Sequence, residues 1–151
     1  MSAQAPTLTA PILIGKRNNQ VKVAIKAVDF KNINAMSLWL EYNKSALTFK
    51  KATFANKLKV ASTPQFAASQ VSDETMKFDV SWSSIKGVTL KKNQVLVYLY
   101  FKCAKQAGET TLHWNNEVAN SNECVFATIE GIPVTLPDGP GNFIDGKVTV
   151  K

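Results

Sequence analysis

The sequence predicts an all-β fold, an antiparallel sandwich or barrel. Apolar side chains recur at every second position over most of the 151 residues, as expected for strands with one buried face. Helical periodicity is hard to find between these stretches, and glycine, asparagine and proline punctuate them at short intervals. Short strands that follow one another without helices between them are typical of a two-layer antiparallel architecture.

The first half of the chain contains three alternating stretches. Residues 20–28, QVKVAIKAV, alternate between an apolar face and a face that carries Lys22 and Lys26. Residues 35–42, AMSLWLEY, separate into two rows. The apolar row contains Met36, Leu38, Leu40 and Tyr42. The other row contains Ala35, Ser37, Trp39 and Glu41. The third stretch, LTFKKATF, occupies residues 47–54. A core needs only the first row, so a tryptophan among small and charged neighbours in the second row calls for another explanation.

The second half of the chain contains the longest strand signals. Residues 76–84, MKFDVSWSS, place four large side chains on one face: Met76, Phe78, Val80 and Trp82. Residues 94–103, QVLVYLYFKC, are nearly all apolar. One of their rows contains Val97, Leu99, Phe101 and Cys103, and the other contains Leu96, Tyr98 and Tyr100. Residues 110–118 direct Leu112 and Trp114 inward, and the chain closes with GKVTVK at residues 146–151.

Turn signals separate these stretches. They lie at Asp29–Asn34, Asn43–Ser45, Gly87, Lys91–Asn93, Gly108 and Pro137–Asn142. No internal repeat and no linker-like segment interrupts the series, and the length is that of one domain. We therefore expect a single domain over residues 1–151.

The formal charge of +7 is unevenly distributed along the chain. Residues 1–105 hold 16 of the 18 Lys and Arg residues but only 5 of the 11 Asp and Glu residues. Lysines that alternate with apolar residues are ordinarily solvated outward positions of strands. A nucleic-acid partner is not expected, because the basic residues form no dense cluster and Arg17 is the single arginine. Membrane insertion is not expected, because no apolar run approaches about 18 residues.

The N-terminal segment bears on localisation. MSAQAPTLTAP has no apolar core of a signal peptide. Its Ala, Pro and Thr content is that of the start of a mature exported protein, so we expect an extracellular or cell-surface protein whose signal sequence was removed. A cytosolic protein is the alternative.

Catalysis, metal binding and cofactor binding are not expected. His113 is the only histidine, and no nucleophile-elbow pattern accompanies it. One histidine and two cysteines, Cys103 and Cys124, do not have the spacing of a zinc site. The two cysteines either pair in a disulfide or remain buried thiols, and the sequence leaves both open.

Four stretches of the sequence resemble one particular family more closely than they resemble β-sandwich proteins in general. They are IGKRNNQVKVAIKAVDFKNINAMSLWLEYNKSALTF at 14–49, GVTLKKNQVLVYLYFKCAKQAGETTLHW at 87–114, NNEVANSN at 115–122 and FIDGKVTV at 143–150. In their order and spacing they resemble the cohesin domain, the receptor module of cellulosome scaffolds. The first stretch departs in one place, because Asn43-Lys44 stands where cohesins usually have Asp-Pro.

The resemblance implies a fold and a function. The fold would be a nine-stranded antiparallel β-sandwich with jelly-roll topology. The function would be non-catalytic binding of a dockerin, a small calcium-binding helical module fused to enzymes such as those of polysaccharide degradation. The dockerin's helices would lie on one flat sheet face.

The resemblance also implies where the partner binds. In cohesins the partner face includes the strands that match residues 34–42, 76–84 and 110–115, and the alternation selects their outward side chains. The predicted partner-binding residues are Ala35, Ser37, Trp39, Glu41, Lys77, Asp79, Ser81, Ser83 and His113, with Thr111 beside the last. On this interpretation Trp39 is an exposed recognition aromatic. The alternative is that it covers the sheet beside a loop and touches no partner.

Two positions on this face need separate consideration. Asp79 either accepts hydrogen bonds from a partner or pairs with Lys77 or Lys102 without further effect. Many cohesins carry an Asn and an Asp, two residues apart on the first strand, that bind a Ser or Thr of the dockerin. Here the matching positions are Ala35 and Ser37, so the usual recognition residues are missing and the subtype of the partner is open.

Two other functions stay open. Tyr98 and Tyr100 would project from the opposite sheet near Lys22 and Lys26, and many carbohydrate-binding modules stack sugar rings on planar aromatics of that kind. A jelly-roll carbohydrate-binding module that holds polysaccharide on these tyrosines or on Trp39 is one alternative. The tyrosines would otherwise shield the sheet by cross-strand packing. The other alternative is a structural domain of a surface protein.

Overall fold

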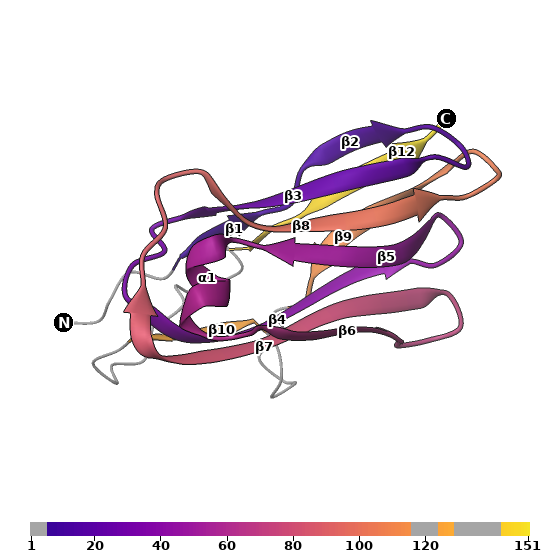
Figure 1. Ribbon diagram of the computed structural model, residues 1–151. Helices are drawn as coiled ribbons and strands as arrows, with labels where there is room; N and C mark the ends of the chain where they lie inside the picture. Colours follow the sequence, from indigo (N-terminus) through magenta and orange to yellow (C-terminus); the bar gives the residue numbers. More distant parts are fainter. Residues whose placement is uncertain (1–5, 116–123, 129–142) are drawn as a thin grey trace.

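Two β-sheets packed face to face make up the protein (Figure 1). The computed structural model describes residues 6–115, 124–128 and 143–151. The five-stranded sheet has the order β11 (Phe143–Ile144), β1 (Thr7–Thr9), β3 (Gln20–Val28), β8 (Gln94–Cys103) and β5 (Leu47–Phe54). The seven-stranded sheet has the order β2 (Ile12–Gly15), β12 (Gly146–Val150), β9 (Gly108–Trp114), β4 (Ile33–Asn43), β7 (Thr75–Val88) and β6 (Gln65–Gln70), and β10 (Val125–Thr128) pairs with β4.

The predicted all-β sandwich is confirmed, but the strand count and the pairing differ from the prediction. The described residues form twelve strands where nine were expected. The first strand is divided at Pro11, which has no N–H to donate, into β1 in one sheet and β2 in the other. The C-terminal strand is also divided, at Asp145, into β11 and β12. As a result β1 pairs with β11, and β2 with β12, in parallel, so neither sheet is purely antiparallel.

Gly146 is required where the two divided strands pass each other. The N–H of Lys147 donates to the Pro11 carbonyl at 3.0 Å, which brings the start of β12 against the β1–β2 connection. A Cβ added at Gly146 would overlap the carbonyl oxygen of Pro11 and lie 2.7 Å from the carbonyl carbon of Ala10. Only glycine permits this backbone contact.

The core lies between the sheets, and the rows predicted to face inward do so. Met36, Leu38, Leu40 and Tyr42 of β4 are all buried, as is the inward row of β8; on β7 Phe78, Val80 and Trp82 are buried and Met76 is partly buried. Aromatic rings join the layers, with the centroids of Tyr42 and Phe101 4.9 Å apart. Burial of apolar area on this scale is the main stabilising term for a domain of this size.

Burial also changes the ionisation of one core residue. The Tyr42 hydroxyl is a buried polar atom without a hydrogen-bond partner among the described residues. Desolvation disfavours its anion and raises the pKa of Tyr42 from 10.0 to about 12.

The two cysteines are buried thiols, the second of the two predicted alternatives. Cys103 lies at the end of β8, and burial raises the pKa of its thiol. The Cys124 Sγ lies 3.8 Å from the carbonyl oxygen of Trp39 and 3.7 Å from that of Asn115. The Cys124 thiol therefore sits beneath the β4–β9 junction.

A short helix, α1 (Asn56–Ala61), follows β5 and closes one end of the sandwich (Figure 1). Its Leu58 is fully buried, and the Trp82 Nε1–H donates to the carbonyl oxygens of Leu58 and Ser62 at 3.3 and 3.1 Å. Six residues are too few to give a helical repeat in the sequence, so this element was not predicted.

Two expectations about individual residues were wrong. Leu96 was expected on the outward row with Tyr98 and Tyr100, but it is fully buried. The β3–β8 register shifts between Ile25 and Lys26, and this bulge reverses the facing of the first residues of β8. Gly87 was expected in a turn, but it lies inside β7. The predicted turn at Pro137–Asn142 lies outside the described residues.

Candidate functional site

The three strands predicted to carry the partner-binding residues are neighbours in the seven-stranded sheet, in the order β9-β4-β7. Cross-strand pairing aligns their outward side chains. Between β4 and β7 the pairs are Ala35 with Ser83, Ser37 with Ser81, Trp39 with Asp79 and Glu41 with Lys77. Between β4 and β9, Glu41 pairs with His113. All nine predicted residues therefore share one outward face, which we call the β9-β4-β7 face.

Trp39 is the centre of a hydrogen-bonded cluster on this face. Its indole Nε1–H donates to Glu41 Oε2 at 2.8 Å, and the same oxygen accepts from Asn115 Nδ2 at 2.9 Å. The Lys77 Nζ lies 3.9 Å from the centroid of the ring and 3.2 Å from Asp79 Oδ2. The Glu41 carboxylate and the Lys77 ammonium group thus fix the orientation of a large apolar ring, and Asp79 holds the ammonium group.

This arrangement corrects the expected exposure of Trp39. The ring is half-buried and not fully exposed, because the side chain of Lys77 covers it and part of it packs against the core. Of the two predicted pairings of Asp79, the structure has the one with Lys77. Asn115 belongs to the cluster although its role was not predicted. It is the first residue of the NNEVANSN stretch, and the rest of that stretch up to residue 122 lies outside the described residues.

On one side of Trp39 the β9-β4-β7 face carries only small side chains and is flat. Ala35, Ser37, Ser81 and Ser83 occupy two adjacent cross-strand pairs, and we call these four residues the small-residue shelf. Strand β6 borders the shelf with Gln65, which pairs with Ser81, and its Ala67 pairs with Asp79. The shelf consists of one Ala and three Ser residues and has no carboxylate of its own. The backbone of β4 is therefore covered only by short side chains next to the tryptophan.

His113 ends the face on its β9 side and is fixed by a residue that was not predicted. The Asp145 Oδ2 lies 2.7 Å from His113 Nδ1, and the other oxygen accepts from the Trp114 N–H at 2.9 Å. Asp145 stands between β11 and β12, at the break between the two strands. Asp145 lies in FIDGKVTV, but nothing in the sequence indicated a contact 32 residues from His113.

The described residues offer no metal centre and no membrane span. No group of three or more His, Cys, Asp or Glu side chains is gathered closely enough to hold a metal ion in residues 6–115, 124–128 and 143–151. In the same ranges no helix is long and apolar enough to cross a bilayer.

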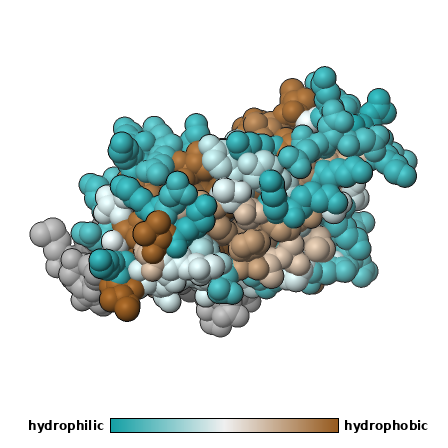
Figure 2. Space-filling model, in the orientation of Figure 1, coloured by the Kyte–Doolittle hydropathy of each residue, from teal (hydrophilic) through white to brown (hydrophobic). Residues whose placement is uncertain are grey.

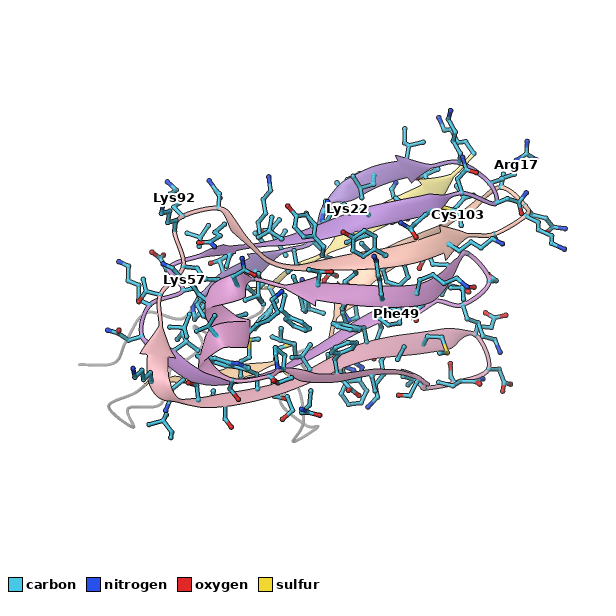
Figure 3. All side chains as sticks on the ribbon, in the orientation of Figure 1. Arg17, Lys22, Phe49, Lys57, Lys92 and Cys103 are labelled. Carbon is cyan, nitrogen blue, oxygen red and sulfur yellow. The ribbon has the colours of Figure 1, made fainter. Side chains whose placement is uncertain are left out.

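The opposite sheet presents a different surface. Tyr98 and Tyr100 are half-buried on its outer face, and lysines cover them. Lys22 Nζ lies 4.0 Å from the centroid of the Tyr98 ring, and Lys51 Nζ lies 4.7 Å from that of Tyr100. Figure 3 shows Lys22 rising from β3 over this face. Ring faces covered by ammonium groups are not open platforms for sugar rings, so the contacts favour the shielding role of these tyrosines.

Comparison with known proteins gives the fold. No protein-family model and no curated protein sequence matches the chain. Solved structures are similar to it over nearly its whole length. A type I cohesin–dockerin complex from Clostridium thermocellum matches with a TM-score of 0.72 and 12% identity, over 98% of this chain and 100% of that chain.

Two further structures come from other organisms. A non-cellulosomal cohesin from the archaeon Archaeoglobus fulgidus matches with a TM-score of 0.63 and 15% identity, over 97% of this chain and 91% of that one. A type III cohesin from a cell-surface anchoring scaffoldin of Ruminococcus flavefaciens matches with a TM-score of 0.63 and 14% identity, over 99% and 89% of the two chains. The chain therefore has the fold of cohesin modules.

Proposed function

We propose that this chain is a non-catalytic cohesin-type module that binds a dockerin-type, calcium-binding partner through the β9-β4-β7 face. The observation that carries the proposal is Trp39, a large ring held in one orientation by Glu41 and Lys77 at the middle of a flat sheet face. Buried aromatic anchors surrounded by polar groups are the usual centres of binding energy at protein interfaces.

The fold supports this assignment. Several of the similar solved structures are cohesins in complex with dockerins, among them one from Clostridium thermocellum and one from Acetivibrio cellulolyticus. Because these relatives are 12% and 14% identical to this chain, they support the fold, and the function rests on the face itself. The same relationship favours an extracellular or cell-surface location.

The shelf determines what kind of dockerin surface fits. Ala35 and Ser37 replace a pair of strong hydrogen-bonding side chains, so an interface here depends more on apolar contact with Trp39 and less on polar contacts to the shelf. Glu41, Lys77 and Asp79 form a polar margin beside the ring. A partner helix with a bulky apolar residue over the shelf and small polar residues at the margin has the complementary shape.

Capture from the host's secreted and surface proteins tests the proposal. The immobilised chain is exposed to that fraction with calcium and with a calcium chelator, and bound proteins are identified by mass spectrometry. We expect a protein with duplicated acidic calcium-binding loops in the calcium sample only, and its loss with immobilised Trp39→Ala. Capture that is unaffected by the chelator and by Trp39→Ala would contradict the proposal.

A further inference from the structure

A second concave surface lies at the end of the molecule that carries α1. The groove has a volume of about 760 Å³ and runs between α1 and the last part of β7. Its floor and walls include Val60, Ala61, Ile85 and Val88. Val60 is 87% exposed and Ile85 is 95% exposed, the two highest exposures among the large apolar side chains of the described residues. Neither residue belongs to the β9-β4-β7 face.

A large bulge in β7 produces the exposure of Ile85. Ala35 of β4 pairs with Ser83, whereas Ile33 pairs with Val88. Two steps along β4 thus correspond to five steps along β7, so three additional residues leave the ladder. Bulges of this kind redirect side chains away from the sheet and often lie beside functional sites. Here the bulge turns an isoleucine out toward α1.

Specific contacts hold the two walls of the groove in place. The Asn32 N–H donates to Thr89 Oγ1 at 3.0 Å, and Lys57 Nζ of α1 donates to the Thr89 carbonyl oxygen at 3.2 Å. A Cβ at Gly87 would lie 3.0 to 3.1 Å from the backbone of Asn32, so the bulge is packed tightly against the β3–β4 loop. On the other side Trp82 hydrogen-bonds the backbone of α1. The groove is therefore preformed, which lowers the entropic cost of binding.

The surroundings of the groove are strongly basic. Lys57 and Lys86 line it, and Lys59 lies in the last turn of α1. The segments that supply both walls and their immediate continuations, residues 56–62 and 84–93, contain five lysines and no Asp or Glu. The neighbouring β3–β4 loop adds Asp29 and Lys31, which offset each other. Figure 3 shows Lys57 and Lys92 at this end, and Figure 2 shows hydrophobic side chains near α1 set among hydrophilic ones.

We propose that this groove binds an acidic peptide segment whose large aliphatic or aromatic side chain inserts between Val60 and Ile85. Carboxylates beside the anchor would pair with Lys57 and Lys86. Apolar anchors in a preformed groove supply affinity, and complementary charge supplies selectivity and speed of association. A second copy of this chain is disfavoured as the occupant, because it would bring two lysine-rich ends together. The site is independent of Trp39 and would allow a second interaction while the β9-β4-β7 face is occupied.

Phage display tests the proposal. A library of short random peptides is selected for binding to the whole chain, and peptides that also bind the Ile85→Ser variant are removed. We expect enriched peptides that combine a large apolar residue with several acidic ones, and amide shifts on binding confined to residues 56–61 and 84–89. Synthetic versions should lose about tenfold or more in affinity with Ile85→Ser or Lys86→Glu. Ile85 is almost fully exposed, so its replacement leaves the fold intact, as circular dichroism would verify.

Matched controls come from the rest of the surface. Ile12→Ser removes an isoleucine that is 76% exposed on β2, and Lys105→Glu reverses an exposed charge in the β8–β9 loop. Both variants, and Trp39→Ala, should bind the peptides as the wild type does. Four results would overturn the proposal: no enrichment, enriched peptides without acidic residues, dimerisation that Ile85→Ser abolishes, or binding of anionic vesicles in place of peptides.

Discussion

The ammonium group of Lys77 lies 3.9 Å from the centroid of the Trp39 ring, while the indole N–H of that ring donates to Glu41. The tryptophan is thus fixed at its edge and covered on its face. The cover is a single flexible side chain that is 24% exposed and is also paired with Asp79, and a cation–π contact is worth about 0.5–1 kcal/mol at exposed sites and about 2 kcal/mol when desolvated. Under the proposed function, a partner would have to displace this lysine to reach the face of the ring.

Acrylamide quenching of tryptophan fluorescence tests whether the Lys77 side chain covers the Trp39 ring. Trp82 and Trp114 are 3% and 4% exposed, so the quenchable emission should come from Trp39. Replacing Lys77 by Ala should increase quenching, and Trp39→Phe should remove most of it. Lys86→Ala, away from the indole, is the control and should have no effect. Equal quenching in the wild type and Lys77→Ala would mean that the lysine does not cover the ring in solution.

The small-residue shelf predicts that added bulk blocks the partner. Ser81→Arg places a long charged side chain on the shelf opposite Ser37 and should weaken binding of the captured partner by more than about tenfold. The fold should persist, because Ser81 is exposed. Thr53→Arg on the outer face of the five-stranded sheet is the control. If calorimetry gave the same affinity for both variants, the shelf would lie outside the interface.

Two glycines give a matched test of how the sheets are joined. Gly146→Ala forces a methyl group into the backbone of Ala10 and Pro11, and should lower the free energy of unfolding by about 3 kcal/mol or more. Gly108→Ala meets no atom within 4 Å and should change stability by less than about 1 kcal/mol. Urea denaturation of both variants measures the difference. Similar stabilities would contradict the described contact between β12 and the β1–β2 connection.

Tyr42 predicts a loss of stability in alkaline solution. The unfolded chain ionises this hydroxyl near pH 10, whereas the folded chain keeps its proton until about pH 12. Above pH 10 the unfolded state therefore releases a proton that the folded state retains, so stability falls as the pH rises. Below pH 10 Tyr42 contributes no pH dependence.

The Tyr42→Phe variant isolates this effect from the titration of the lysines. It should remove part of the decline between pH 10 and 12. At neutral pH it should be at least as stable as the wild type, because the hydroxyl has no hydrogen-bond partner among the described residues. Urea denaturation at several pH values compares the two proteins. Parallel pH profiles would show that the hydroxyl is solvated in the native state.

The inward and outward rows could be predicted because side chains of a strand alternate by geometry alone. For β4, β7 and β9 this rule was sufficient to identify the nine residues of the face, and the resemblance supplied the adjacency of the strands. The rule failed at Leu96, where a bulge adds a residue to one strand and reverses the alternation. A bulge has no distinct signal in a strand as uniformly apolar as QVLVYLYFKC.

Contacts between distant segments could not be predicted. Asp145 reaches His113 across 32 residues, and Asn115 reaches Glu41 across 74. Neither pair has a spacing motif, since each depends on how loops return to the sheet. The groove depends in the same way on α1, which is too short to show periodicity, and on the three additional residues of β7. The sequence contained Val60 and Ile85 but no indication that they meet.

The most direct test of the partner-binding face is the affinity of the captured dockerin-type protein for two variants with changes on opposite sheets. Calorimetry in calcium should give at least a tenfold loss for Trp39→Ala, which corresponds to about 1.4 kcal/mol or more, and no change for Tyr98→Ala. The reverse result, with loss for Tyr98→Ala and wild-type affinity for Trp39→Ala, would place the partner on the five-stranded sheet and contradict binding through the β9-β4-β7 face.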